Sequence, residues 1–200
     1  MVTLTHNIRI GKNAIFQMIC KARTEDTNLS KVDMDSLINY FAPPIPKKPK
    51  VKEQWVALAV GKKDKRSVLN FLHVSNGKLW ATDDHRMHWC DTDLADGFYC
   101  PKTLFAVDNE PGPYPEVTRV IPQKFETDSA TLTRDDWSIE LNGKVRRALL
   151  NDHPQYVFQE CLLLDALSAG DVKYQLVEGG MMKGESVHGE FVIMGLSEKY

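Results

Sequence analysis

Residues Lys78–His88 read KLWATDDHRMH, a run of strand-forming residues followed by a polar turn and the start of a second run. The tripeptide Ser-Asn-Gly at 75–77, just before it, is a tight-turn signal. Two further apolar runs, Trp55–Val60 and Val68–Val74, precede that turn. Short apolar runs joined by turns predict an antiparallel meander. Periodicity alone does not distinguish a strand from a helix in such short runs, so residues 52–60 could instead form the end of a helix.

The sequence predicts the same order of strands and helix in both halves of the chain. Near the N-terminus we expect a strand at Thr5–Ile10 and a helix at Lys12–Arg23, because the apolar residues of the latter recur at i, i+3, i+4 and i+7. A second helix is expected at Gln155–Ala169, closed by Gly170. Further strands are expected at Ala130–Leu132, Trp137–Leu141, Lys173–Val177 and Glu190–Met194. The order strand, helix, strands in both halves predicts an α+β domain.

Two stretches lack the periodicity of helices and strands. Residues Thr24–Lys52 are polar and then proline-rich (APPIPKKPKVK), which predicts an insertion or long loop with a short helix at Met34–Phe41. Residues 95–118 are rich in glycine and proline and predict a second loop. Charge is also uneven, since residues 43–66 carry 8 basic and 2 acidic side chains although the net charge of the chain is -2. This basic stretch is either a solvated loop or a contact for phosphate.

Length and composition restrict the protein class. Two hundred residues, 42% hydrophobic and 26% charged, are typical of one soluble globular domain. No run approaches the roughly 18 apolar residues of a membrane span, and the N-terminus lacks the apolar stretch of a secretory signal, so we expect a cytoplasmic protein. The cysteines form no CxxC pair, and we expect reduced thiols at Cys20, Cys90, Cys100 and Cys161.

The densest chemical cluster is DDHRMHWCDTD, Asp83–Asp93. A metal site would need His85 and His88 to converge on one ion, but alternation along a strand places them on opposite faces. Cys90 and Cys161 lie in sequence contexts typical of small core residues rather than of thiolate nucleophiles. GxSxG, Walker and GxGxxG motifs are absent from the sequence. We therefore expect no catalytic residues, no metal and no cofactor.

The stretch KLWATDDHRMH closely resembles the signature around ATDGHRL of bacterial DNA polymerase III beta subunits, the ring-shaped sliding clamps. Three more segments resemble that family in the same order, namely YPEVTRVIP at 114–122, CLLLDALSAGDVKYQL at 161–176 and GEFVIMGL at 189–196. The resemblance spans about residues 66–196. DGFYCPKTLFAVD at 96–108 resembles clamp-like proteins encoded by bacteriophages, and the length of the chain suits a single-domain version of that type.

The resemblance implies a DNA-clamp domain of two strand-helix-strand repeats, with antiparallel sheets outside and two helices on the inner face. We expect one domain over residues 1–200, with a first repeat at 1–94 that contains the insertion at about 24–53, a loop at 95–118 and a second repeat at 119–200. The implied function is that of a non-catalytic processivity factor in the cytoplasm of a bacterium or phage-infected cell. Its partners would be double-stranded DNA, bound independently of sequence, and peptides of the DNA polymerase and clamp loader.

The family's apolar peptide cleft, carried onto matching positions, comprises Thr82, Asp84, His85, Arg86, Met87, Pro122, Val192 and Met194. Methionine and valine suit an adaptable apolar groove, and His85 and Arg86 would form its polar rim. Asp84 stands where the family commonly has glycine, at a turn in which a positive φ is expected.

Two further features differ from the family. The second predicted helix contains Glu160 and Asp165 and no basic residue, so phosphate contact is expected elsewhere. The candidates are Lys12, Lys21, Arg23, Lys47, Lys48, Lys50, Lys52, Arg146 and Arg147. The usual clamp chain has three such domains and this chain has length for one, so a closed ring would need about six copies or other partners.

Three alternatives stay open. The first is a monomeric clamp-like adaptor or decoy that binds replication peptides without encircling DNA, and the second is a metal-dependent enzyme that uses Asp83–Asp93. The third concerns Met34–Phe41, MDSLINYF, whose spacing is similar to that of a eukaryotic clamp-binding peptide without its glutamine. That segment would either dock on another clamp or pack as a short amphipathic helix on its own domain.

Overall fold

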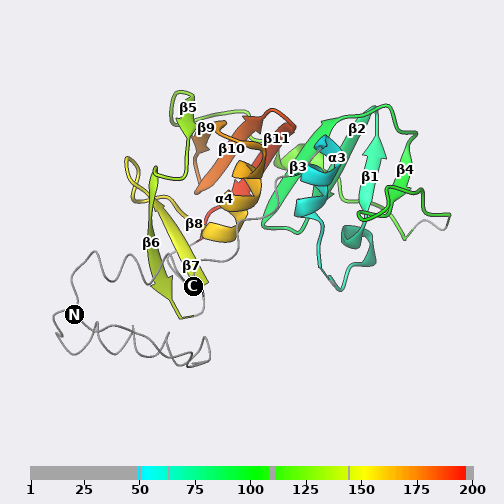
Figure 1. Cartoon of the computed structure of the whole chain (residues 1–200), viewed down its shortest axis with the longest axis horizontal. Coiled ribbons are helices and arrows are strands. Elements are labelled where there is room, and N and C mark those ends of the chain that lie inside the picture. The colour runs from blue at the N-terminus through cyan, green and yellow to red at the C-terminus, as the bar shows by residue number, and fades with distance from the viewer. Residues whose placement is uncertain (1–48, 50, 63, 109–110, 144, 197–200) are drawn as a thin grey trace, which may run out of the picture. The chain divides into compact units, whose positions relative to one another are not determined.

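The computed structural model describes residues 49, 51–62, 64–108, 111–143 and 145–196 (Figure 1). The chain divides into two units, Met1–Pro44 and Ile45–Tyr200, and the described residues all belong to the second. The predicted elements at Thr5–Ile10, Lys12–Arg23 and Met34–Phe41 lie outside the described residues. Of the described helices, none is long and apolar enough to span a membrane.

Within the described part, eight strands form one antiparallel sheet in the order β4-β1-β2-β3-β11-β10-β9-β5 (Figure 1). These strands are β4 (Gly97–Tyr99), β1 (Leu72–Ser75), β2 (Lys78–Thr82), β3 (Arg86–Asp91), β11 (Gly189–Met194), β10 (Met181–Ser186), β9 (Val172–Val177) and β5 (Ala130–Leu132). A smaller antiparallel sheet contains β6 (Trp137–Asn142), β7 (Val145–Leu150) and β8 (Val157–Gln159).

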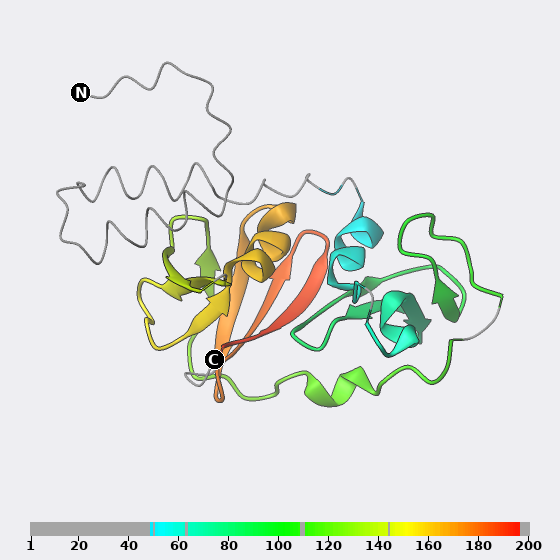
Figure 2. The same ribbon diagram turned by 90° about the horizontal axis from the view of Figure 1, so that it is seen from below.

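The large sheet consists of two similar halves that meet in the middle. In the first half the helix α3 (Lys52–Val56) precedes the meander β1-β2-β3, and in the second half α4 (Glu160–Ala166) precedes β9-β10-β11. The last strands of the two meanders, β3 and β11, pair with each other. Both helices lie on the same face of the sheet (Figure 2). The predicted α+β clamp-domain fold with antiparallel sheets is confirmed. Its two helices on one face are α3 and α4, whereas the predicted first helix, Lys12–Arg23, lies outside the described residues.

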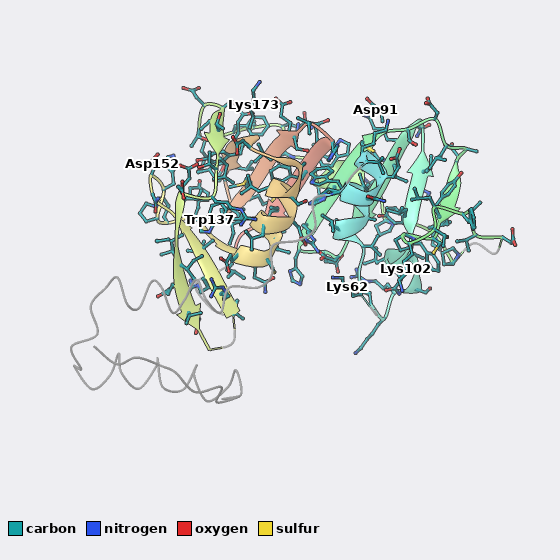
Figure 3. The ribbon with its side chains drawn as sticks, in the orientation of Figure 1. Lys62, Asp91, Lys102, Trp137, Asp152 and Lys173 are labelled. Atoms are coloured by element: carbon teal, nitrogen blue, oxygen red, sulfur yellow. The ribbon has the colours of Figure 1, made fainter. Side chains whose placement is uncertain are left out.

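Side-chain alternation places most of the buried sheet residues in two apolar clusters on opposite faces, and Phe98 of β4 belongs to a third cluster with Val68 and Leu69. The larger cluster lies between the sheet and the helices, and it includes Trp55 of α3, Leu163 of α4 and Phe191 of β11. Trp137 of β6 belongs to the same cluster, whereas charged residues such as Asp91 and Lys173 lie at the periphery (Figure 3). The smaller cluster, on the face opposite the helices, comprises Trp80, Met87, Trp89, Val117 and Val192.

The local turn signals predict the hairpins correctly. Asn76 and Gly77 have φ values of 54° and 70°, as a tight hairpin turn between β1 and β2 requires. The Asn-Gly signal at 142–143 likewise connects β6 to β7, and Gly143 has a φ of 60°. Strands β5, β6, β9 and β11 lie within one residue of their predicted bounds.

The predicted strand at Trp55–Val60 is wrong, and the helical alternative for 52–60 is confirmed. The segment forms α3 and the 3-10 helix η1 (Ala57–Ala59). Trp55 is completely buried, its indole Nε1 donates a hydrogen bond to the carbonyl oxygen of Ala166 at 3.2 Å, and its ring stacks on His88 at 4.3 Å. These contacts connect α3 to the other helix and to the sheet, and no local pattern in the sequence encodes them.

Other boundaries also differ from the prediction. The first three residues of the predicted strand Val68–Val74 belong to the 3-10 helix η2 (Ser67–Asn70), and the strand begins at Leu72. The predicted helix Gln155–Ala169 begins only at Glu160, because Val157–Gln159 pairs with β7 instead. The loop predicted at 95–118 contains β4, whose three residues pair with β1. Strands β7 and β10 were not predicted.

The buried His88 makes stability depend on pH. Burial, with a smaller contribution from the Arg86 guanidinium, lowers the pKa of His88 to about 3. The folded protein therefore keeps this imidazole neutral, whereas the unfolded chain protonates it below about pH 6.5. The free energy of unfolding should then decrease by up to about 1.4 kcal/mol for each pH unit between about 6.5 and 3.

Urea unfolding of the wild type and of His88→Gln at pH 7.5, 6.5 and 5.5 measures this effect. Because the variant lacks the titrating group, its stability should fall less with acidification than that of the wild type. The stability difference between the two proteins should therefore narrow toward pH 5.5. Parallel pH profiles would contradict the assignment of this pH dependence to His88.

Candidate functional site

A row of side chains across the centre of the sheet forms an apolar floor. Thr82 of β2 pairs with Met87 of β3, and Met87 pairs with Val192 of β11. These three residues point to the face opposite the helices, where Met87 and Val192 are almost completely buried. The junction of the two halves therefore carries a floor made of residues from both.

The segment that follows β4 covers part of this floor. It contains the 3-10 helix η3 (Val117–Val120) and crosses the sheet on the face opposite the helices (Figure 2). Between η3 and the floor lies a cavity of about 200 Å³. Val120 and Met194 line it with 56% and 42% of their surface exposed, so apolar side chains are accessible at its mouth.

A second cavity of about 630 Å³ adjoins the first. The two share Asp84 and Met194 as lining residues. The remaining lining residues of the second cavity are His85, Asn142, Val145, Arg147, Gln159, Gly195 and Leu196. We call the two adjoining cavities the groove.

Backbone hydrogen bonds from three segments fix the end of β11 beside the groove. The Met194 amide donates to the carbonyl oxygen of His85 at 2.8 Å, and the Leu196 amide donates to that of Val157 at 2.7 Å. The Gly195 amide donates to the carbonyl oxygen of Gly180 at 2.7 Å, and a Cβ atom at Gly195 would lie 2.1 Å from that oxygen. Only glycine fits at position 195.

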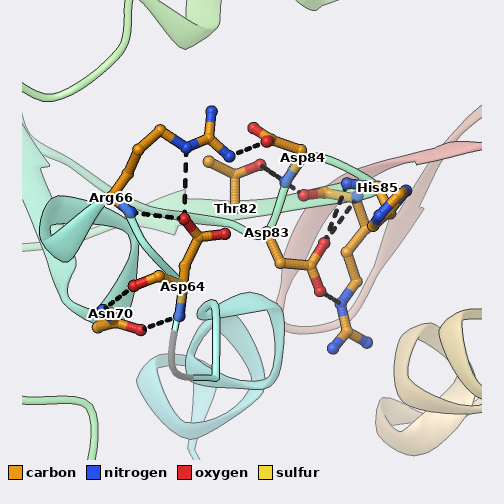
Figure 4. Close-up of polar contacts among 8 residues, drawn as sticks. Asp64, Arg66, Asn70, Thr82, Asp83, Asp84 and His85 are labelled. Atoms are coloured by element: carbon orange, nitrogen blue, oxygen red, sulfur yellow. Dashed lines mark hydrogen bonds and ion pairs between the residues drawn. The ribbon is translucent and has the colours of Figure 1, made fainter.

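The turn between β2 and β3 fixes the polar side of the groove. Asp84 has a φ of 72°, so the positive φ expected at this position is present. Its amide donates to Thr82 Oγ1 at 3.2 Å, and the amides of His85 and Arg86 donate to Asp83 Oδ1 at 3.1 Å (Figure 4). Two short polar side chains thus stabilise a turn for which glycine would be the usual residue.

Asp84 also takes part in a surface ion-pair chain (Figure 4). Its carboxylate pairs with the guanidinium of Arg66, whose Nε lies 3.3 Å from Asp64 Oδ1. A hydrogen bond from the Arg66 amide, followed by its guanidinium, lowers the pKa of Asp64 below its usual value. Arg66 is therefore shared between two carboxylates, one of which lines the groove.

Arg86 faces away from the groove mouth. Like His88 and Cys90 on the same strand, its side chain points toward the helices, where only 7% of it is exposed. Its guanidinium pairs with Asp83 at 3.1 Å and with Asp165 of α4, and donates to the carbonyl oxygen of Leu58 at 2.6 Å. Arg86 thus connects the turn, α4 and η1 on the helix side of the sheet.

The structure brings most of the expected cleft residues together. Six of them, Thr82, Asp84, Arg86, Met87, Val192 and Met194, line the first cavity, and His85 lines the second. Pro122 lines neither of these two cavities. Val117 and Val120 also line the first cavity, and the sequence does not single them out. Both lie in the segment YPEVTRVIP, which also contains Pro122. The sequence likewise does not indicate that β7 and β8 contribute to the second cavity.

The candidates for phosphate contact that lie among the described residues form ion pairs or hydrogen bonds within the protein. Arg146 pairs with the carboxylate of Glu160, and Arg147 Nη1 lies 3.4 Å from Glu140 Oε2. Lys52 Nζ donates to the carbonyl oxygen of Asp91 at 2.5 Å. The remaining candidates, Lys12, Lys21, Arg23, Lys47, Lys48 and Lys50, lie outside the described residues.

The cluster Asp83–Asp93 does not converge on one point. His85 is exposed at the turn, whereas His88 is buried under α3, where its Nδ1 lies 3.1 Å from the carbonyl oxygen of Trp55. Among the described residues, no group of three or more His, Cys, Asp or Glu side chains is placed to hold a metal ion. Burial raises the pKa of the Cys90 thiol to about 11, which disfavours a thiolate at neutral pH.

The architecture of this chain is similar to that of bacterial sliding clamps among solved structures. The DNA polymerase III beta chain of Streptococcus pneumoniae TIGR4 matches with a TM-score of 0.55 at 15% identity, over 72% of this chain and 61% of that one. The described residues have the sliding-clamp fold. The DNA polymerase sliding clamp of Pseudomonas aeruginosa matches with a TM-score of 0.50 at 17% identity, over 80% of this chain and 69% of that one.

A third match carries a bound peptide. The Helicobacter pylori beta clamp bound to a DNA ligase peptide matches with a TM-score of 0.50 at 12% identity, over 72% of this chain and 62% of that one. The chain thus spans less than two thirds of this relative and of the S. pneumoniae beta chain. No protein-family model and no curated protein sequence matches it.

The buried position of Arg86 predicts that its ion pairs contribute more to stability than those of an arginine exposed on the surface. Arg86→Met should lower the free energy of unfolding by about 3 kcal/mol, because it leaves Asp83 and Asp165 partly buried without their cation. Arg119→Met is the matched control, since Arg119 pairs with Glu116 on the surface and should contribute less than about 1 kcal/mol. Urea unfolding at pH 7.5 measures both, and equal effects would contradict the connecting role of Arg86.

Proposed function

We propose that this chain is a non-catalytic, sliding-clamp-like processivity factor that binds short peptides of replication proteins in the groove. The observation that carries the proposal is the groove itself, an accessible apolar cavity at the β3–β11 junction of a sliding-clamp fold. A floor of methionine and valine side chains adapts to several apolar partners. The peptide-bound H. pylori beta clamp, which has the same fold, supports this function.

We infer that double-stranded DNA, bound independently of sequence, is the second partner. The acidic residues of α4 do not oppose this, because Glu160 pairs with Arg146 and Asp165 pairs with Arg86. Phosphate contact is then assigned to Lys12, Lys21, Arg23, Lys47, Lys48 and Lys50. A single-domain, bacteriophage-type clamp over residues 1–200 would need about six copies to close a ring in the cytoplasm of its host.

A second candidate is a monomeric adaptor or decoy that binds replication peptides without encircling DNA. It is favoured by one observation, that Lys52, Arg146 and Arg147 all have partners within the protein. Both candidates use the groove in the same way. They differ in the number of chains and in retention on DNA.

Peptide binding tests the function that both candidates share. The probe is a fluorescein-labelled octapeptide with a Leu-Gln-Phe core, and its binding is measured by fluorescence anisotropy. Val120→Ser and Met194→Ser should each raise its Kd at least fivefold, because each removes an exposed apolar contact of the groove. Val187→Ser is the matched control, since Val187 is 80% exposed and lines neither cavity. Failure of the wild type to bind, or equal Kd values throughout, would contradict the proposal.

The number of chains separates the two candidates. We expect light scattering over a concentration series to give a native mass about six times that of one 22.7 kDa chain. The ring should stay on nicked circular DNA after a high-salt wash and leave when the DNA is linearised, because topological linkage is not screened by salt. A monomer at every concentration, with no retention when a clamp loader is supplied, would support the adaptor instead.

A further inference from the structure

The mouth of the first cavity is acidic. Asp84 lines it from the turn between β2 and β3, and Glu116 lines it from the segment before η3. Each carboxylate pairs with an exposed arginine, Arg66 and Arg119 respectively, and neither arginine lines either cavity. A ligand that enters the cavity therefore meets the carboxylates rather than their counter-ions.

The basic residues that line the groove do not cancel this charge. The guanidinium of Arg86 lies on the helix side of the sheet and pairs with two carboxylates, one of them from Asp165. Arg147 and His85 line only the second cavity, and Arg147 is paired with Glu140. The charged side chains at the mouth of the first cavity are thus the two carboxylates, and their arginine partners do not line it.

Asp84 is the better placed of the two carboxylates. It lines both cavities, so a peptide that fills both with apolar side chains must pass it. Its backbone is fixed by the hydrogen bond to Thr82, and its side chain is 49% exposed, compared with 61% for that of Glu116. Asp84 therefore offers a positioned acceptor at the middle of the groove.

Arg66 is an exchangeable partner for this carboxylate. Its side chain is 52% exposed, and a surface ion pair of this kind contributes at most about 1 kcal/mol. If Arg66 leaves Asp84, it keeps Asp64 as its partner through the guanidinium and the backbone amide. A cation on a ligand can therefore replace Arg66 at Asp84 at little cost.

We propose that the groove selects peptides that carry a basic residue between two apolar anchors, with Asp84 as the partner of the basic residue. This inference rests on the proposed function, because it concerns the ligand of the same groove. A charge-assisted hydrogen bond beside apolar contacts that exclude water is stronger than one on open surface. Charge at this point therefore sets which peptides bind, in addition to apolar fit.

Three octapeptides that share the flanks of the probe and differ in the core, Leu-Lys-Phe, Leu-Gln-Phe and Leu-Glu-Phe, test the inference. At low salt the wild type should bind the lysine peptide about tenfold more tightly than the glutamate peptide, and added salt should reduce this ratio. Asp84→Asn should bring the two Kd values within twofold, since asparagine tolerates a positive φ and lacks the charge. Arg66→Gln should strengthen binding of the lysine peptide.

Asp91→Asn is the matched control, because Asp91 is also an ion-paired carboxylate of this sheet, with Lys78, but lines neither cavity. It should keep the wild-type preference. Equal binding of the three peptides by the wild type, or weaker binding of the lysine peptide by Arg66→Gln, would overturn the charge selection and leave the proposed function intact. Failure of all three peptides to bind would overturn both.

Discussion

The antiparallel pairing of β3 with β11 is the constraint on which the rest of the molecule depends. Four residue pairs, from Arg86 with Ile193 to Trp89 with Glu190, join two meanders into one sheet. Because side chains alternate, this register sends Met87 and Val192 to one face and Arg86 and Ile193 to the other. A shift of one residue would place the groove floor in the core and core residues in the groove. The fold and the groove are therefore set by the same backbone hydrogen bonds.

Local signals explain which parts of the fold could be predicted. The turn at Asn76-Gly77 and the run that follows it depend on residues close in sequence, and they predict the hairpin and the bounds of β2 well, whereas β1 begins four residues later than predicted. Trp55 forms part of a helix because its ring stacks on His88 and its indole bonds to Ala166, 33 and 111 positions away. The segment Val157–Gln159 forms a strand because β7 is available as its partner. Such contacts are not encoded in a short window.

The parts of the groove formed by residues close in sequence could be predicted, whereas the parts that depend on tertiary packing could not. The floor residues and the turn at Asp84 lie in two short segments, and their resemblance to clamp segments was enough to place them. The wall at Val117 and Val120 depends on where η3 crosses the sheet, which follows from tertiary packing. The alternation of side chains along β3 predicts that Arg86 points to the same face as His88, toward the helices. The resemblance to clamp sequences, in contrast, predicts a place at the rim of the groove.

Arg86 connects the groove face of the sheet to the helix face, so a substitution there would affect both faces. Its backbone borders the groove, while its guanidinium neutralises Asp165 on α4 and bonds to the carbonyl oxygen of Leu58 in η1. Replacing it to alter the groove would leave a partly buried carboxylate on α4 without its cation, a larger cost than losing an exposed ion pair. The exposed residues Asp84, Val120 and Met194 carry no such constraint. The ligand preference of this groove can therefore be altered at these exposed positions, whereas a change at Arg86 would also disturb the contacts between the turn and the helices.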